Sequence, residues 1–170
     1  MSLKGWDLAM LLYTTETPPT PPGKPVTFSA GDKGGVAGWT ANPAYKPLGQ
    51  AEVVCWRGFN GMRIKPQGAR QSPFFSTDGL DVQPGDKLRF SMRVKGLGEW
   101  AAGVYQYRSR KDGAWRGVSM SKFTASSADR AKPVSFTVKV GKDARLVRPV
   151  LETYGEDEIT FFDLRIAIER

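Results

Sequence analysis

The stretch Lys87-Leu88-Arg89-Phe90-Ser91-Met92-Arg93-Val94-Lys95 decides the fold class. Leu88, Phe90, Met92 and Val94 alternate strictly with polar or charged residues. A period of two residues places the apolar side chains on one face of a β-strand and the polar ones on the other. The stretch therefore predicts a strand with one face in a core and the other in water.

The same pattern recurs further along the chain. The segments 134–140 and 162–168 alternate in the same way, and we find no amphipathic helix of four turns. Turn sequences separate the segments at strand-length intervals: Asp78-Gly79, Pro84-Gly85-Asp86, Gly96 to Gly98, Lys111-Asp112-Gly113, Gly141-Lys142-Asp143 and Gly155-Glu156-Asp157. Roughly ten short strands without helices predict an all-β protein, an antiparallel β-sandwich of the jelly-roll type.

The length of 170 residues suits one domain with an appended segment. Five prolines between Thr17 and Pro25 favour an extended, stiff connector. We therefore predict an N-terminal extension and Pro-rich linker over residues 1–25 and a β-sandwich over residues 26–170. Trp6 to Thr15 alternates well enough to form one edge strand, either on the sandwich or on a neighbouring domain. The longest apolar run, Leu8 to Tyr13, is too short to span a membrane, which needs about 20 residues.

The chain contains no histidine and a single cysteine. The absence of histidine excludes a Ser-His-Asp triad, a Cys-His pair and an H-E-x-x-H zinc site. Cys55 alone can form neither an intrachain disulfide nor a cysteine-rich zinc site. Any catalysis would have to use carboxylates, lysine or tyrosine, and Glu99 and Glu152 show no partner in the sequence. We therefore expect that the protein is not an enzyme.

Six motifs follow one another along most of the chain. They are Asn60–Pro66, Ser72-Pro73, Val82–Gly96, Gly103–Tyr107, Val147–Glu152 and Phe161–Ile166. In this order they resemble carbohydrate-binding modules of the galactose-binding-like jelly-roll superfamily, over about Gly38 to Glu169. The resemblance implies a non-catalytic, extracellular or cell-surface accessory module that targets a linked glycoside hydrolase or polysaccharide lyase to a polysaccharide. It also implies that no cofactor is required.

Such modules commonly hold a structural calcium with a Gly-Phe-Glu motif and an aspartate of the last strand. Here the first motif corresponds to Phe28-Ser29-Ala30-Gly31-Asp32-Lys33, which lacks the glutamate, while Asp163 matches the aspartate. The resemblance therefore implies a calcium site with Asp163 and Asp32 as its candidate ligands. The alternative is that Asp163 makes a backbone hydrogen bond or faces water.

Strand alternation predicts a set of polar side chains on the outer faces of several strands. They are Arg63, Arg93, Gln106, Arg148 and Glu152. The family topology would gather them on one concave sheet face, and guanidinium groups bind carboxylates and vicinal hydroxyls in a bidentate manner. An acidic polysaccharide is therefore the preferred ligand. The alternative is that these charges only solvate strands that do not adjoin.

Aromatic side chains that lie near loop ends are candidates for stacking on sugar rings. They are Trp100, Trp115 and Tyr154. Alternation favours core positions for Trp56, Tyr105 and Tyr107, whereas Trp39 fits a core or a cleft equally well.

The net charge of +8 also admits nucleic-acid binding. The basic residues are dispersed, however, and no helix-turn-helix, RNP-type or zinc motif is present, so we expect no nucleic-acid partner. The main alternative is a jelly-roll domain that mediates structural or protein contacts without binding sugar, because a fold alone does not establish a function.

Overall fold

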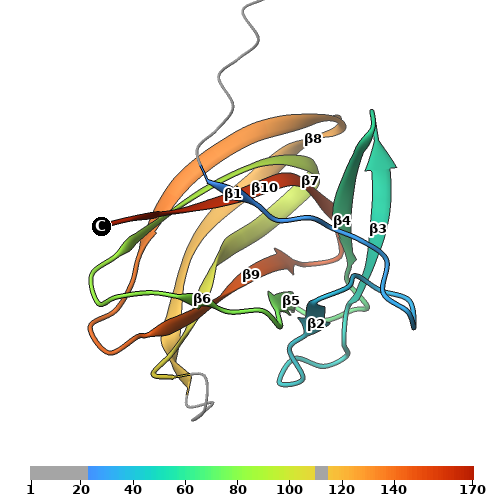
Figure 1. The fold of residues 1–170 in the computed structure, drawn as a ribbon. Helices are drawn as coiled ribbons and strands as arrows, with labels where there is room; N and C mark the ends of the chain where they lie inside the picture. The colour runs from blue at the N-terminus through green and yellow to red at the C-terminus, as the bar shows by residue number, and fades with distance from the viewer. Residues whose placement is uncertain (1–22, 110–114) are drawn as a thin grey trace, which may run out of the picture.

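The computed structural model describes residues 23–109 and 115–170, which form strands, turns and loops. Over these residues there is no helix, so the predicted all-β class is confirmed (Figure 1). The strands are β1 (Lys24–Pro25), β2 (Trp39–Ala41), β3 (Gln50–Trp56), β4 (Phe59–Lys65), β5 (Gln71–Ser76), β6 (Leu80–Asp81), β7 (Lys87–Tyr107), β8 (Trp115–Lys139), β9 (Leu146–Tyr154) and β10 (Ile159–Glu169).

All strand pairs are antiparallel, and the main order is β2-β5-β9-β7-β10-β4-β3. The first half of β7 pairs with β10 and the second half with β9, while β8 follows β7 along both halves. We call sheet I the layer of β3, β4, β10, the first half of β7 and the second half of β8. Sheet II comprises β2, β5, β9, the second half of β7 and the first half of β8. Figure 1 shows β7 and β8 as long curved strands that run through both layers.

Gly96 marks the point where β7 passes from one sheet to the other. The β7–β8 register shifts between Val94 and Gly96, and Gly96 has a φ of 146°. A Cβ at this position would lie 2.6 Å from the carbonyl oxygen of Glu158. Only glycine tolerates this backbone conformation and this close approach, so the residue permits the bend.

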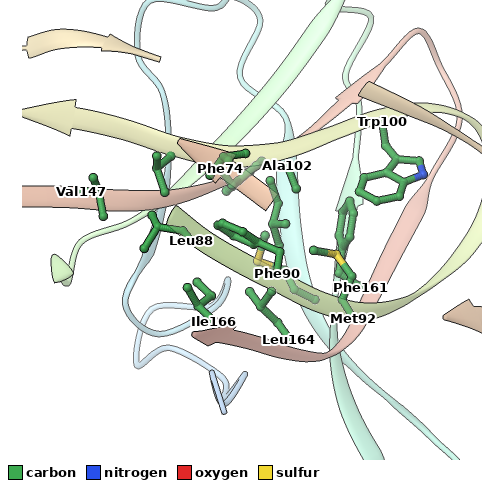
Figure 2. Packing of buried hydrophobic residues seen from close by; sticks show 14 of the residues in the cluster. Phe74, Leu88, Phe90, Met92, Trp100, Ala102, Val147, Phe161, Leu164 and Ile166 are labelled. Carbon is green, nitrogen blue, oxygen red and sulfur yellow. The ribbon is translucent and has the colours of Figure 1, made fainter. Parts of the chain in front are cut away.

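The core lies between the two sheets. Leu88, Phe90 and Met92 point into it as predicted (Figure 2). Trp100 is only 1% exposed, and its ring stacks on that of Phe123 with centroids 4.6 Å apart. Inward side chains from both halves of β7 therefore form one continuous core.

A bulge in β10 breaks the alternation that the sequence predicts there. The register shifts between Phe162 and Arg165, and Asp163 has a φ of 48°. Phe161 and Leu164 consequently point into the core, while Phe162 opposes Gly61 of β4 on the outer face of sheet I. The predicted inward position of Phe162 is wrong, because an inserted residue reverses the faces of a strand.

Lys24 and Pro25 pair with Ile166 and Arg165, so the sheet includes two residues of the predicted linker. Residues 1–22, with the predicted edge strand, lie outside the described residues, and the boundary between extension and sandwich stays a prediction. None of the described segments is a helix long and apolar enough to cross a membrane.

Candidate functional site

The five polar residues predicted to form one cleft floor do not share a face. Arg63 and Arg93 lie on the outer face of sheet I, since their neighbours Met62, Ile64 and Met92 point into the core. Arg148 and Glu152 lie on the outer face of sheet II, opposite the core residues Val147 and Leu151. Gln106 faces inward. The prediction of a single floor is therefore wrong, because the strands that carry these residues belong to different layers.

Gln106 has a structural role. Its side chain is 7% exposed, its Nε2 donates to Ser119 Oγ at 2.7 Å, and its Oε1 accepts from the backbone N–H of Gly141 at 2.7 Å. Both ends of the amide therefore bind protein groups and tie β7 to β8 and to the turn after β8. The predicted outward position of Gln106 is wrong, because the alternation from Trp100 through Val104 continues inward to Gln106.

The aromatic candidates also divide. The predicted exposure of Trp100 is wrong, because its indole fills the core between Phe123 and Phe161. The side chain of Trp115 lies outside the described residues; its backbone opens β8 and pairs with Tyr107. Tyr154 is half-buried at the end of β9, where it remains a candidate.

Two of the predicted core aromatics, Tyr105 and Tyr107, face outward from sheet II. The inner positions of their strand are taken by Trp100, Ala102 and Val104. With Phe75 of β5 and Tyr154 of β9 they form a surface across three strands that also carries Arg148 and Glu152. We call this surface the tyrosine face; its members are Phe75, Tyr105, Tyr107, Arg148, Glu152 and Tyr154.

The centre of the tyrosine face is buried. Tyr105 pairs with Arg148, Gly103 with Val150, and Ala101 with Glu152 across the β7–β9 ladder. Although these residues lie on the outside of a sheet, Ala101 is 1% and Val150 0% exposed. Larger neighbouring side chains therefore cover the small ones at the centre of this face.

Tyr105 is held rigidly within this face. Its hydroxyl accepts a hydrogen bond from Asn42 Nδ2 at 3.0 Å, and its ring lies 5.6 Å from that of Phe75. Burial raises the pKa of Tyr105 to about 12. The hydroxyl is therefore protonated over the physiological range and can donate to a ligand.

Arg148 and Tyr107 form a second contact on the same surface. The guanidinium carbon of Arg148 lies 5.1 Å from the centre of the Tyr107 ring, a cation–π arrangement. Burial raises the pKa of Tyr107, and the nearby Arg148 opposes this shift. Arg148 Nε is buried and has no hydrogen-bond partner among the described residues. Arg148 Nε is therefore a buried donor that no described group satisfies.

Glu152 provides an acceptor on the tyrosine face. It is 5% exposed, and its Oε1 has no hydrogen-bond partner in the part of the chain that the structure describes. Burial raises the pKa of Glu152 to about 7, against the hydrogen bond with Tyr154 and the charge of Lys122, which lower it. Near neutral pH the carboxyl can therefore accept or donate a hydrogen bond.

One end of the tyrosine face opens into a groove of about 580 Å³, lined by polar side chains that include Gln71, Glu99, Lys122 and Tyr154. Lys122 Nζ lies 4.2 Å from the centre of the Tyr154 ring and 3.0 Å from Glu99 Oε2. Burial and the neighbouring Glu152 raise the pKa of Tyr154. The groove continues the row of hydrogen-bonding groups beyond Glu152.

The calcium site implied by the family resemblance is not supported. Asp163 Oδ1 accepts a hydrogen bond from Arg165 Nε at 3.2 Å, and Asp32 is exposed. Over residues 23–109 and 115–170, no three His, Cys, Asp or Glu residues form a group that could hold a metal ion. Calcium needs about six to eight oxygen ligands, and these residues do not provide that set. Asp163 instead forms part of the β10 bulge.

Sequence reasoning missed Tyr105, Tyr107, Phe75 and Lys122 as site residues. The sequence did contain a signal for the two tyrosines of β7. Trp100, Ala102 and Val104 alternate along this strand, so they predict the inner face, and Tyr105 and Tyr107 then fall on the outer face. The aromatic character of Tyr105 and Tyr107 suggested core positions, but other side chains of the same strand occupy the inner face.

Comparison with known proteins bears on the fold. No family model matches the chain, and no curated protein matches it in sequence. Solved structures do match it.

The enzymatically active domain of tailspike protein 4 of bacteriophage CBA120 has a TM-score of 0.57 at 10% identity, over 78% of this chain and 20% of that one. The CBM22-1 and GH10 modules of Clostridium thermocellum xylanase 10B have a TM-score of 0.54 at 15% identity, over 86% of this chain and 29% of that one. The family 11 carbohydrate-binding module of Clostridium thermocellum has a TM-score of 0.55 at 12% identity, over 85% of this chain and 96% of that one.

The chain thus spans less than a third of the first two structures and almost the whole length of the third. The predicted resemblance to jelly-roll carbohydrate-binding modules is confirmed at the level of the fold, a β-sandwich in which long strands are shared by two layers.

Proposed function

We propose that this chain is a non-catalytic carbohydrate-binding module that binds a polysaccharide on the tyrosine face. The proposal depends on one observation: one outer sheet face combines three tyrosines with a buried Arg148 Nε and Glu152 Oε1 that have no partner among the described residues. Buried polar groups without partners are costly, and a ligand that satisfies them recovers that cost.

Sugar chemistry matches this surface. The C–H face of a pyranose packs on an aromatic ring, while its hydroxyls both donate and accept hydrogen bonds. Arg148 and Glu152 lie four positions apart on β9, which corresponds to about 13 Å along a strand. The surface is therefore longer than one sugar ring and suits a section of a polymer.

Two of the structures with the same fold support a polysaccharide ligand. The xylanase 10B modules were solved with xylohexaose, and the family 11 module was solved with a β-1,3-1,4-mixed-linked tetrasaccharide. In the xylanase the module is joined to a catalytic GH10 module. We propose the same arrangement here: the segment over residues 1–25 connects the sandwich to a glycoside hydrolase or polysaccharide lyase outside the cell or on its surface.

Binding without cleavage fits the carboxylates of the tyrosine face and of the groove at its end. Glycoside hydrolysis ordinarily uses two carboxyl groups that flank the bond to be broken. Here Glu99 is ion-paired with Lys122, and Glu152 hydrogen-bonds with Tyr154. The module would act by raising the effective concentration of a linked enzyme on its polymer, for which weak binding suffices.

Affinity electrophoresis against xylan, mixed-linked β-glucan, galactan and polygalacturonate tests the proposal. We expect retardation by at least one polymer, and a loss of affinity of about tenfold or more in Tyr107→Ala and in Arg148→Ala. Lys142→Ala is the matched control, because Lys142 is exposed in the turn after β8.

The same polymers separate the alternatives. Release of reducing ends during incubation would show an enzyme instead. If the whole panel fails to retard the protein, a structural or protein-interaction domain is favoured. If Arg148→Ala binds normally but melts at a much lower temperature, Arg148 is structural and the tyrosine face is not the site.

A further inference from the structure

The outer face of sheet I carries a second cluster of aromatic and cationic side chains. Trp56 ends β3 and lies over Phe162 of β10, with ring centroids 5.6 Å apart. The guanidinium carbon of Arg57 lies 4.8 Å and Lys95 Nζ 5.9 Å from the centre of the Trp56 ring. Arg93 pairs with Phe162 in the β7–β10 ladder. We call this cluster the Trp56 patch; its members are Trp56, Arg57, Arg93, Lys95 and Phe162.

The patch rests on a firm base. Phe162 is 2% exposed, and a Cβ on Gly61 would overlap its ring. The glycine therefore leaves room for Phe162 to lie flat on the sheet, and Trp56 covers it. The predicted core position of Trp56 is wrong, since the side chain is half-buried on this outer face. An indole in this position can pack against a ligand.

The cations of the patch differ from the other basic residues of sheet I. Arg63 and Lys65 pair with Glu52 at 3.3 and 2.7 Å, and Arg89 pairs with Glu169 at 2.8 Å. Arg57, Arg93 and Lys95 have no carboxylate partner among the described residues. The patch therefore has uncompensated positive charge beside its aromatic surface, which is a complement to an anionic group.

A groove of about 320 Å³ adjoins the patch and shares Lys95 with it. Its polar lining also includes Arg63, Asp157, Glu158 and Thr160, so donors and acceptors line the same space. Hydroxyl groups of a sugar use both kinds of partner. The carboxylates of Asp157 and Glu158 would repel an anionic group inside the groove, so the groove suits the neutral part of a ligand whose charge lies at Arg93 and Lys95.

We propose that the Trp56 patch and this groove form a second glycan site that takes a sugar ring bearing a carboxylate or a sulfate. The ring enters the groove and packs against Trp56. Its acidic group binds Arg93 and Lys95, and the exposed Arg57 can move aside or join them. The site lies on the opposite sheet from the tyrosine face and uses none of its residues, so the two proposals stand or fall separately.

Isothermal titration of the full chain with an oligogalacturonide and with the corresponding neutral galactan oligosaccharide tests the site, with dextran sulfate and dextran as the sulfate arm. The double variant Arg93→Gln/Lys95→Gln should bind the acidic ligand about tenfold more weakly or worse. Binding of neutral ligands should not change. Lys142→Gln is the charge-matched control. Trp56→Phe keeps a ring over Phe162 and should weaken binding less than the double variant.

If the unmodified chain binds only one of the two acidic ligands, that result identifies the acidic group of the sugar as a carboxylate or a sulfate. Unchanged acidic binding in the double variant would overturn the proposal, as would no binding of either acidic ligand by the unmodified chain. Loss of acidic binding in Arg148→Ala alone would place that binding on the tyrosine face. Equal weakening of retention on duplex DNA, with a steep dependence on salt, would show a general polyanion surface instead of a glycan site.

Discussion

The tyrosine face and the Trp56 patch combine the same kinds of residue in opposite ways. On the tyrosine face Glu152 is buried and Arg148 is half-buried, with tyrosine rings beside them. On the Trp56 patch the ring packs on Phe162, with the exposed Arg57 and the half-buried Lys95 beside it. Both depend on β7, which contributes Lys95 before Gly96 and Tyr105 after it. Residues only ten positions apart on one strand therefore belong to two surfaces of different chemistry, because the strand changes sheet between them.

The two faces also treat carboxylates differently. Burial raises the pKa of Glu152 to about 7. On sheet I the hydrogen bond from Lys65 lowers the pKa of Glu52, against a smaller effect of burial. One surface therefore favours the protonated carboxyl and the other favours the charged carboxylate.

Replacement of the two tryptophans should produce the largest difference. Trp100→Ala removes a core ring and should cost about 3–5 kcal/mol in the free energy of unfolding. Trp56→Ala removes a half-buried ring and should cost about 1–2 kcal/mol. Urea denaturation followed by circular dichroism measures both values. Equal losses would mean that Trp56 is part of the core and not of a surface patch.

Glu152→Gln should stabilise the protein at high pH. The raised pKa means that the folded state holds its proton more tightly than the unfolded state, so the cost of ionising Glu152 is absent below pH 4.5 and grows up to about pH 7. The shift corresponds to about 3 kcal/mol. The variant should therefore melt well above the unmodified chain at pH 8 and near it at pH 4. The same difference at both pH values would contradict the burial of a charged group.

Tyr105→Phe should have a smaller effect on the stability of the tyrosine face. It removes the hydroxyl that accepts from Asn42 Nδ2, at a cost of about 1 kcal/mol. Tyr107→Phe is the matched control, because the structure gives the Tyr107 hydroxyl no hydrogen bond among the described residues. Thermal melting compares the two variants. A larger loss in Tyr107→Phe would show that the loop holding Asn42 does not brace Tyr105.

Glu52→Gln should have the smallest effect, with a pH dependence opposite to that of Glu152→Gln. The lowered pKa of Glu52 provides stability that is present above pH 4.5 and lost as the pH falls through the folded-state pKa. Because the side chain is 43% exposed, solvent screens the pair, and we expect a loss below about 1 kcal/mol at pH 7. Melting at pH 7 and pH 3 measures it. A variant that is destabilised more at pH 3 would contradict the sign.

Alternation along single strands was a good guide to the fold. It placed Leu88 and Met92 in the core and Arg93 outside, and it placed Arg148 and Glu152 on one outer face. These assignments need only the geometry of one strand. The all-β class followed from the same period repeated between turns.

The candidate site was harder to predict, because it depends on which strands adjoin. Arg63 and Arg148 have similar local patterns but lie on different sheets, a difference set by long-range pairing. Phe162 changed face through a single inserted residue at Asp163. The loop-end position of Trp100 suggested exposure and the aromatic character of Tyr105 suggested a core position, whereas Trp100 lies on the inner face of sheet II and Tyr105 on the outer face.

The uninterrupted passage of β7 through both layers has a mechanical consequence. Its 21 residues link the outer surface of one layer to that of the other through a single run of backbone. If each side bound a polymer, the two polymers would be connected through the sandwich by one continuous strand. No loop or domain interface on this strand would lie between them. Such a domain would act as a crosslink as well as an anchor, and its mixtures with two polymers should thicken or gel at concentrations where either polymer alone remains fluid.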